Sequence, residues 1–84
     1  MVILKMRNNF GNEVSVEKTN HCIRVNVRSQ RGRFGSDESM RSQANMVARR
    51  ALYRNPVVHS ESYGNIESGN GRIVGRWAKI TYTR

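Results

Sequence analysis

Apolar and polar residues alternate along three segments near the start of the chain. In residues 2–7, 13–17 and 23–28 every second position is apolar, a period of two that is typical of strands with one buried face. Turn-forming residues separate them, at 8–12 and again at Asn20-His21, and these favour tight connections. The pattern predicts three consecutive antiparallel strands, each with one face in the core.

Charged residues in the second and third segments predict how those two strands pair. With Asn20-His21 as a two-residue turn, Glu17 lies opposite Arg24 and Glu13 lies opposite Arg28. Opposite charges that face each other across strands contribute roughly 0.2–1 kcal/mol per pair. We therefore expect this register, in which both strand arginines already have a carboxylate partner.

A helical period replaces the alternation after a glycine-containing loop. Ser36 is the expected N-cap, and Asp37 and Glu38 follow it, where the helix dipole favours negative charge. Asn55-Pro56 is expected to end the helix, which we place at about 37–54. Its apolar residues recur on one stripe: Met40, Ala44, Val47, Ala48, Ala51 and Leu52.

The last part of the chain, from Val57, has the pattern of a long hairpin. A three-residue turn at Gly69-Asn70-Gly71 suits such a hairpin, and Gly64 and Gly75 are the expected bulges. This turn predicts a register in which aromatic and charged residues meet across the strands: Tyr63 with Trp77, Glu61 with Lys79, Ile66 with Val74 and Val58 with Tyr82.

The elements predict one α+β domain over residues 1–84, with the order βββαββ. The simplest arrangement is an antiparallel sheet with one helix packed on one face, leaving the other face to solvent or a partner. Only 37% of the residues are hydrophobic and the mean hydropathy is -0.70, so we expect a thin core and modest stability. A thin core and exposed strand edges are compatible with a homodimer.

The charge of the chain is +9, and arginine supplies most of it. There are twelve arginines against three lysines, and the planar guanidinium grips phosphates or carboxylates in a fork that lysine lacks. Residues 24–54 hold eight of the arginines and only two acidic residues. This concentration predicts a basic patch that meets an acidic partner.

Ten residues are candidates for binding nucleic acid, because guanidinium groups contact phosphates and aromatic rings stack on bases. Each has a plainer interpretation as well: the arginines can serve solubility, and Trp77 can stabilise the hairpin against Tyr63. Glu13, Glu17 and Glu61 are expected to pair across strands, and Asp37 is expected at the start of the helix. Most of the candidate arginines are therefore expected to have no carboxylate partner within the protein. The candidates are Arg31, Arg33 and Phe34 in the loop, Arg41, Arg49, Arg50 and Arg54 on the helix, and Arg72, Arg76 and Trp77 on the hairpin.

The sequence gives no sign of a metal, a cofactor or a catalytic group. Cys22 is the single cysteine, which excludes an internal disulfide and a cysteine-based zinc site. No phosphate-binding glycine motif or nucleophile elbow is present. Lys5 and Arg7 interrupt the apolar start of the sequence, and no apolar run approaches about 20 residues. We therefore expect no signal peptide, no membrane partner and a soluble cytoplasmic protein.

Three functional hypotheses follow. The leading one is a small non-enzymatic nucleic-acid-binding protein with little sequence specificity, for DNA or RNA, single- or double-stranded. The alternative is a protein-interaction module or inhibitor, of the kind that phages and mobile elements direct against host defence, which binds an acidic protein or a nucleoprotein complex through arginine anchors. The third is a toxin-like ribonuclease that uses His59 or a tyrosine, although no clustered acid-base pair is visible.

Overall fold

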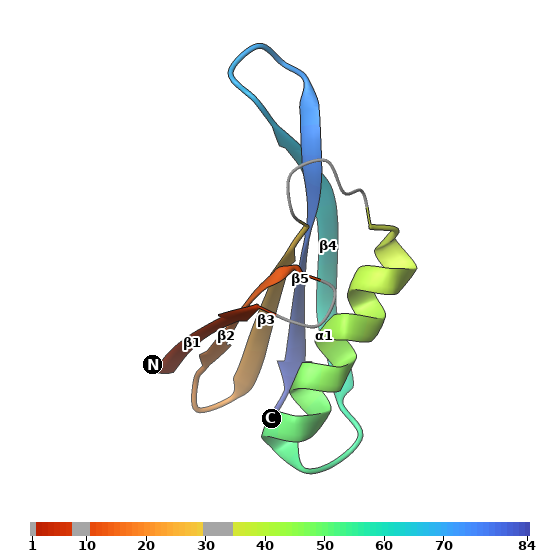
Figure 1. Ribbon diagram of the computed structural model, residues 1–84. Coiled ribbons are helices and arrows are strands. Elements are labelled where there is room, and N and C mark those ends of the chain that lie inside the picture. Colours follow the sequence, from red (N-terminus) through yellow and green to blue (C-terminus); the bar gives the residue numbers. More distant parts are fainter. Residues whose placement is uncertain (1, 8–10, 30–34) are drawn as a thin grey trace.

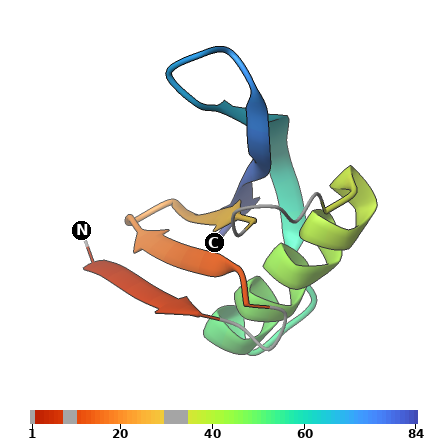
Figure 2. The same ribbon diagram turned by 45° about the horizontal axis from the view of Figure 1, so that its top comes forward.

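The structure is a computed structural model that describes residues 2–7, 11–29 and 35–84, and it confirms the α+β fold and the order βββαββ. One antiparallel sheet of five strands carries a single helix across one face (Figures 1 and 2). The elements are β1 (Val2–Arg7), β2 (Glu13–Lys18), β3 (Cys22–Arg28), α1 (Asp37–Leu52), β4 (Val57–Glu67) and β5 (Ile73–Thr83).

The strands lie in the order β1-β2-β3-β5-β4, so β5 enters the sheet between β3 and β4. This leaves β1 and β4 as the two edges. β3 pairs with residues 77–83 of β5, while the first residues of β5 pair with β4 alone. The far end of the β4–β5 hairpin therefore projects beyond the other strands (Figure 1), and the molecule is 39 Å long but only 22 × 21 Å across.

The register predicted for β2 and β3 is confirmed, with Glu17 opposite Arg24 and Glu13 opposite Arg28. Only one of these two pairs of opposite charges forms an ion pair. Arg24 Nη1 lies 3.4 Å from Glu17 Oε2, whereas Arg28 forms no ion pair with any residue that the structure describes. The expectation that Arg28 has a carboxylate partner is therefore not met among the described residues.

The register predicted for β4 and β5 is right at Val58, which pairs with Tyr82, and wrong from there on. His59 is an extra residue on β4, so the pairs formed by residues 60–66 move by one position. As a result Tyr63 faces Ala78 instead of Trp77. Because neighbouring positions point to opposite sides of a sheet, Tyr63 and Trp77 lie on different faces.

The same shift overturns the other pairs predicted for this hairpin. Glu61 faces Ile80 rather than Lys79, and Ile66 faces Gly75. Val74 is a second extra residue, this time on β5, and it restores the original offset at the end of the hairpin. The bulges therefore lie at His59 and Val74, and the predicted bulges at Gly64 and Gly75 were wrong.

Gly64 has a packing role that explains the absence of a side chain. It pairs with Trp77 on the face of the sheet away from the helix, and a Cβ atom there would lie 2.5 Å from Trp77 Cζ2. Such a contact is too close for carbon atoms, which approach to about 3.5 Å. Glycine thus lets the indole lie against β4.

Both ends of α1 have a local cause. The Ser36 hydroxyl accepts a hydrogen bond from the Ser39 N–H at 3.1 Å, as predicted for an N-cap. At the other end Tyr53 adopts the left-handed conformation, with φ of 58°, and its N–H donates to the Arg49 carbonyl at 2.9 Å. The helix ends at Leu52, two residues before the predicted limit, because Tyr53 turns the chain first.

The core lies between α1 and the middle of the sheet, chiefly β3 and β5. The predicted burial of one face of β1 was wrong: Leu4 is 49% exposed and Met6 is 43% exposed, because the helix does not extend over this edge strand. The buried apolar residues are Val14, Val16, Ile23, Val25, Val27, Met40, Ala44, Ala48, Ala78, Ile80 and Tyr82.

Candidate nucleic-acid interface

Three predicted arginines gather around a hollow at the C-terminal end of α1. Arg49 and Arg50 belong to the last turn of the helix, and Arg54 follows in the connection to β4. The hollow is broad and open, with a volume of about 680 Å³, and no carboxylate lines it among the described residues. Its lining residues are Met46, Arg49, Arg50, Tyr53, Arg54 and Asn55.

Helical spacing produces this cluster. Counted from Met46, the next members of the cluster follow after three, four and seven positions, which places them along one face of a helix. They are Arg49, Arg50 and Tyr53. That face is turned away from the apolar stripe, so its side chains reach solvent. Two of the cations also lie in the last turn, where the helix dipole favours positive charge by about 0.3–1 kcal/mol each.

Tyr53 is the residue that the sequence prediction missed. Tyr53 is 94% exposed, and it adopts a left-handed conformation that glycine usually takes. The exposed ring therefore stands beside three guanidinium groups, a combination that suits base stacking together with phosphate contact. The signal available in the sequence was an aromatic residue at the end of the helix, next to Arg54.

The three arginines of the hollow have few competing contacts. Arg54 Nη2 donates one long hydrogen bond, of 3.4 Å, to the carbonyl of Thr83. Within the ranges that the structure covers, neither Arg49 nor Arg50 forms an ion pair. Most of their donors thus remain available to a ligand.

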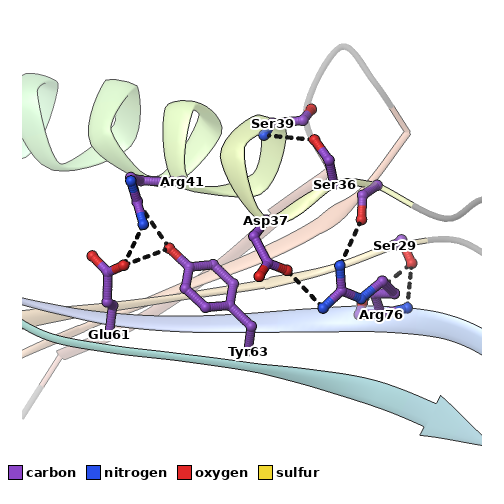
Figure 3. Close-up of polar contacts among 9 residues, drawn as sticks. Ser29, Ser36, Asp37, Ser39, Arg41, Glu61, Tyr63 and Arg76 are labelled. Atoms are coloured by element: carbon purple, nitrogen blue, oxygen red, sulfur yellow. Dashed lines mark hydrogen bonds and ion pairs between the residues drawn. The ribbon is translucent and has the colours of Figure 1, made fainter.

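Arg41, also predicted for binding, has partners within the protein. It donates to the carboxylate of Glu61 and to the hydroxyl of Tyr63, the latter at 3.1 Å (Figure 3). The Tyr63 hydroxyl, and after it the Glu61 carboxylate, raise the pKa of Arg41 further above its ordinary value. The expectation that Arg41 is uncommitted was wrong, because the bulge at His59 turns Glu61 toward the helix.

Arg76 is likewise engaged in holding the fold together. Its Nη2 lies 2.6 Å from Asp37 Oδ1, and its Nη1 donates to the Gly35 carbonyl at 3.4 Å (Figure 3). Its backbone N–H donates to Ser29 Oγ at 2.7 Å. The side chain thus ties β5 to the start of α1, and the expectation that it is uncommitted was wrong.

Trp77 lies on the opposite side of the sheet from α1. It is opposite Arg28 on β3 and Gly64 on β4, and Lys5 and Lys79 border the same shallow hollow of about 360 Å³. Glu13 also lines this hollow. The structure therefore separates Trp77 from the arginines of the helix.

The remaining predicted residues do not join either hollow. Arg72 is exposed in the turn between β4 and β5, at the projecting end of the hairpin. Arg31, Arg33 and Phe34 lie outside the described residues. His59, the candidate for proton transfer, is the bulged residue of the edge strand β4 and does not line the helix hollow.

The described residues hold no group of three or more His, Cys, Asp or Glu side chains that could bind a metal ion. In the same ranges no helix is both long and apolar enough to cross a bilayer. Comparisons of this chain with protein-family models, with curated proteins and with solved structures find no significant match.

Proposed function

We propose that this protein binds nucleic acid without catalysis, through the hollow formed by Arg49, Arg50, Arg54 and Tyr53. The observation that supports the proposal is the exposed Tyr53 beside three guanidinium groups that have no carboxylate partner among the described residues. Guanidinium groups bind phosphate oxygens, and an aromatic ring stacks on a base. Arg49, Arg50 and Arg54 supply the charge, and Tyr53 supplies the stacking surface.

This arrangement favours binding with little sequence specificity. Phosphate contacts position a nucleic acid but carry no direct sequence information, and every base has a face on which tyrosine can stack. Specific recognition requires several side chains that reach base edges. The hollow offers one amide side chain, Asn55, for that purpose.

The test is fluorescence anisotropy with labelled DNA and RNA, single- and double-stranded, between 50 and 300 mM NaCl. We expect binding to weaken as salt rises, with a log–log slope of about −0.7 to −0.9 for each phosphate contacted. Replacing Arg49, Arg50 and Arg54 together by Gln should reduce the slope by about two to three and weaken binding about 100-fold at 100 mM salt.

A matched variant controls for total charge. Lys5, Arg28 and Lys79 on the other face of the sheet are replaced by Gln, which removes the same three charges. We expect this variant to keep most of its affinity. Absence of binding at 50 mM salt, or equal losses in the two triple variants, would contradict the proposal.

A further inference from the structure

The outer edge of β1 is unpaired in the part of the chain that the structure describes. β1 is the first strand of the sheet order and pairs with β2 on one side only. An edge strand presents unpaired N–H and C=O groups along its outer side, onto which an extended peptide can add as a further strand. The β1–β2 ladder is regular over all six residues of β1, which suits such an addition.

The helix side of β1 borders an apolar groove of about 270 Å³. Leu4 and Met6 form one wall, and their exposed fractions of 49% and 43% are high for large apolar side chains. Covering such side chains removes apolar surface from water and therefore favours binding. The other lining residues are Val16, Lys18, Val47, Arg50 and Ala51.

Positive side chains lie on both faces of this edge strand. Lys18 and Arg50 border the groove, and the exposed Lys5 and Arg7 alternate with Leu4 and Met6, so they point to the other face. On that face Glu13 lies opposite Arg7, whereas Lys5 faces the uncharged Ser15. No carboxylate lines the groove itself among the described residues.

We propose that β1 binds an extended acidic segment of a protein partner by strand addition. The segment alternates apolar residues, which fill the groove beside Leu4 and Met6, with Asp or Glu, which face Lys5 and Arg7. Its backbone pairs with the outer edge of β1. This site is separate from the proposed nucleic-acid surface, although Arg50 borders both hollows.

The chemistry of this edge argues against other occupants. A second copy of this chain would bring Lys5 and Arg7 next to their own counterparts, and each copy carries a charge of +9. Nucleic acid matches the charge but has no peptide groups to pair with the strand and no apolar side chains for the groove. An acidic strand can pair with the backbone of β1, fill the apolar groove and oppose the positive charges at the same time.

The test is selection from a displayed library of ten-residue peptides. Apolar residues occupy alternate positions, and the positions between them are drawn from Asp, Glu, Ser, Asn, Lys and Arg. We expect Asp and Glu to be enriched against the wild-type protein. Against a Lys5→Glu/Arg7→Glu variant the enrichment should change to Lys and Arg.

Matched measurements on the selected peptides identify the binding mode. N-methylation of alternate peptide nitrogens on the pairing side, and separately Leu4→Ser/Met6→Ser in the protein, should each weaken binding at least 10-fold. Circular dichroism checks that both variants are folded. Enrichment of neutral or basic peptides, or binding that tolerates N-methylation, would overturn the proposal.

Sedimentation tests the competing occupant. The proposal expects a monomer at micromolar concentration. A wild-type dimer that becomes monomeric in Leu4→Ser/Met6→Ser would overturn the assignment to an acidic partner and identify a second copy as the occupant. Failure of the nucleic-acid assay leaves this result unaffected, because the two proposals are measured with different ligands and different variants.

Discussion

At the scale of single residues, Tyr53 combines an unfavourable backbone with an exposed ring. A side chain in the left-handed conformation costs about 1–2 kcal/mol relative to glycine. Tyr53 is 94% exposed, so burial recovers little of this cost. Residues held in such conformations are often functional. The cost at Tyr53 is therefore consistent with selection for binding rather than for stability.

This trade-off gives a prediction in which stability and binding move in opposite directions. Tyr53→Gly should raise the free energy of unfolding by about 1 kcal/mol, as measured by urea denaturation, and weaken single-stranded nucleic-acid binding by about 1–3 kcal/mol through lost stacking. Tyr53→Phe keeps the ring and should bind like the wild type. Unchanged binding by the glycine variant would remove Tyr53 from the interface.

Tyr82 is the opposite kind of tyrosine, because it is buried in the core and its hydroxyl donates to Asn45 Oδ1 at 2.6 Å. Burial raises the pKa of this hydroxyl above its ordinary value, with smaller contributions from Tyr63 and Glu61. Above pH of about 10 the unfolded chain loses this proton while the folded protein retains it. Stability must then fall as the pH rises.

We therefore predict that the free energy of unfolding decreases above pH of about 10, by up to about 1.4 kcal/mol per pH unit from this one group. In Tyr82→Phe this part of the decrease should disappear, although the variant loses a hydrogen bond at every pH. Tyr53→Phe is the control for the loss of a tyrosine hydroxyl outside the core. Urea denaturation between pH 8 and 11 gives the comparison.

At the scale of elements, the sequence predicts the β2–β3 pairing because a short turn and two pairs of opposite charges agree on one register. It fails for β4 and β5 because a bulge is a local insertion that leaves the alternation on each side intact. His59 and Val74 each add one residue, on opposite strands, so their effects cancel at the ends of the hairpin. Neither histidine nor valine is a residue type that indicates a bulge in the sequence.

The residues of the candidate site also differ in how far the sequence predicts them. Arg49, Arg50 and Arg54 could be predicted together, because all three lie within six positions of one another at the end of the predicted helix. Arg41 and Arg76 could not be separated from them, because their partners are Glu61 and Asp37. These carboxylates lie 20 and 39 positions away in the chain, and only the sheet topology brings them into contact.

The β4–β5 hairpin offers a prediction about its own packing. Gly64→Ala places a methyl group 2.5 Å from Trp77 Cζ2, so the indole must move and the free energy of unfolding should fall by about 1–3 kcal/mol. Tryptophan fluorescence should shift to longer wavelength as the ring becomes more exposed. Gly69→Ala is the matched control, because no atom lies within 4 Å of a Cβ there.

At the scale of the whole molecule, positive charges far outnumber negative ones, so few of them can form ion pairs within the protein. Three ion pairs are present within the described residues, against a net charge of +9. Two of them, Arg41–Glu61 and Arg76–Asp37, join the helix to the sheet. Most of the other cations in the described ranges are exposed. Like charges on a small compact body repel one another and destabilise the folded state.

This balance predicts that salt stabilises the protein while weakening its binding to nucleic acid. Raising NaCl from 20 to 500 mM shortens the Debye length from about 20 Å to about 4 Å, so repulsion should be screened and the free energy of unfolding should rise by an amount on the order of 1 kcal/mol. Arg72 is exposed and forms no ion pair with another described residue. Arg72→Glu removes two units of net charge and should show a smaller rise. A decrease in stability with salt would mean that the three ion pairs outweigh the repulsion.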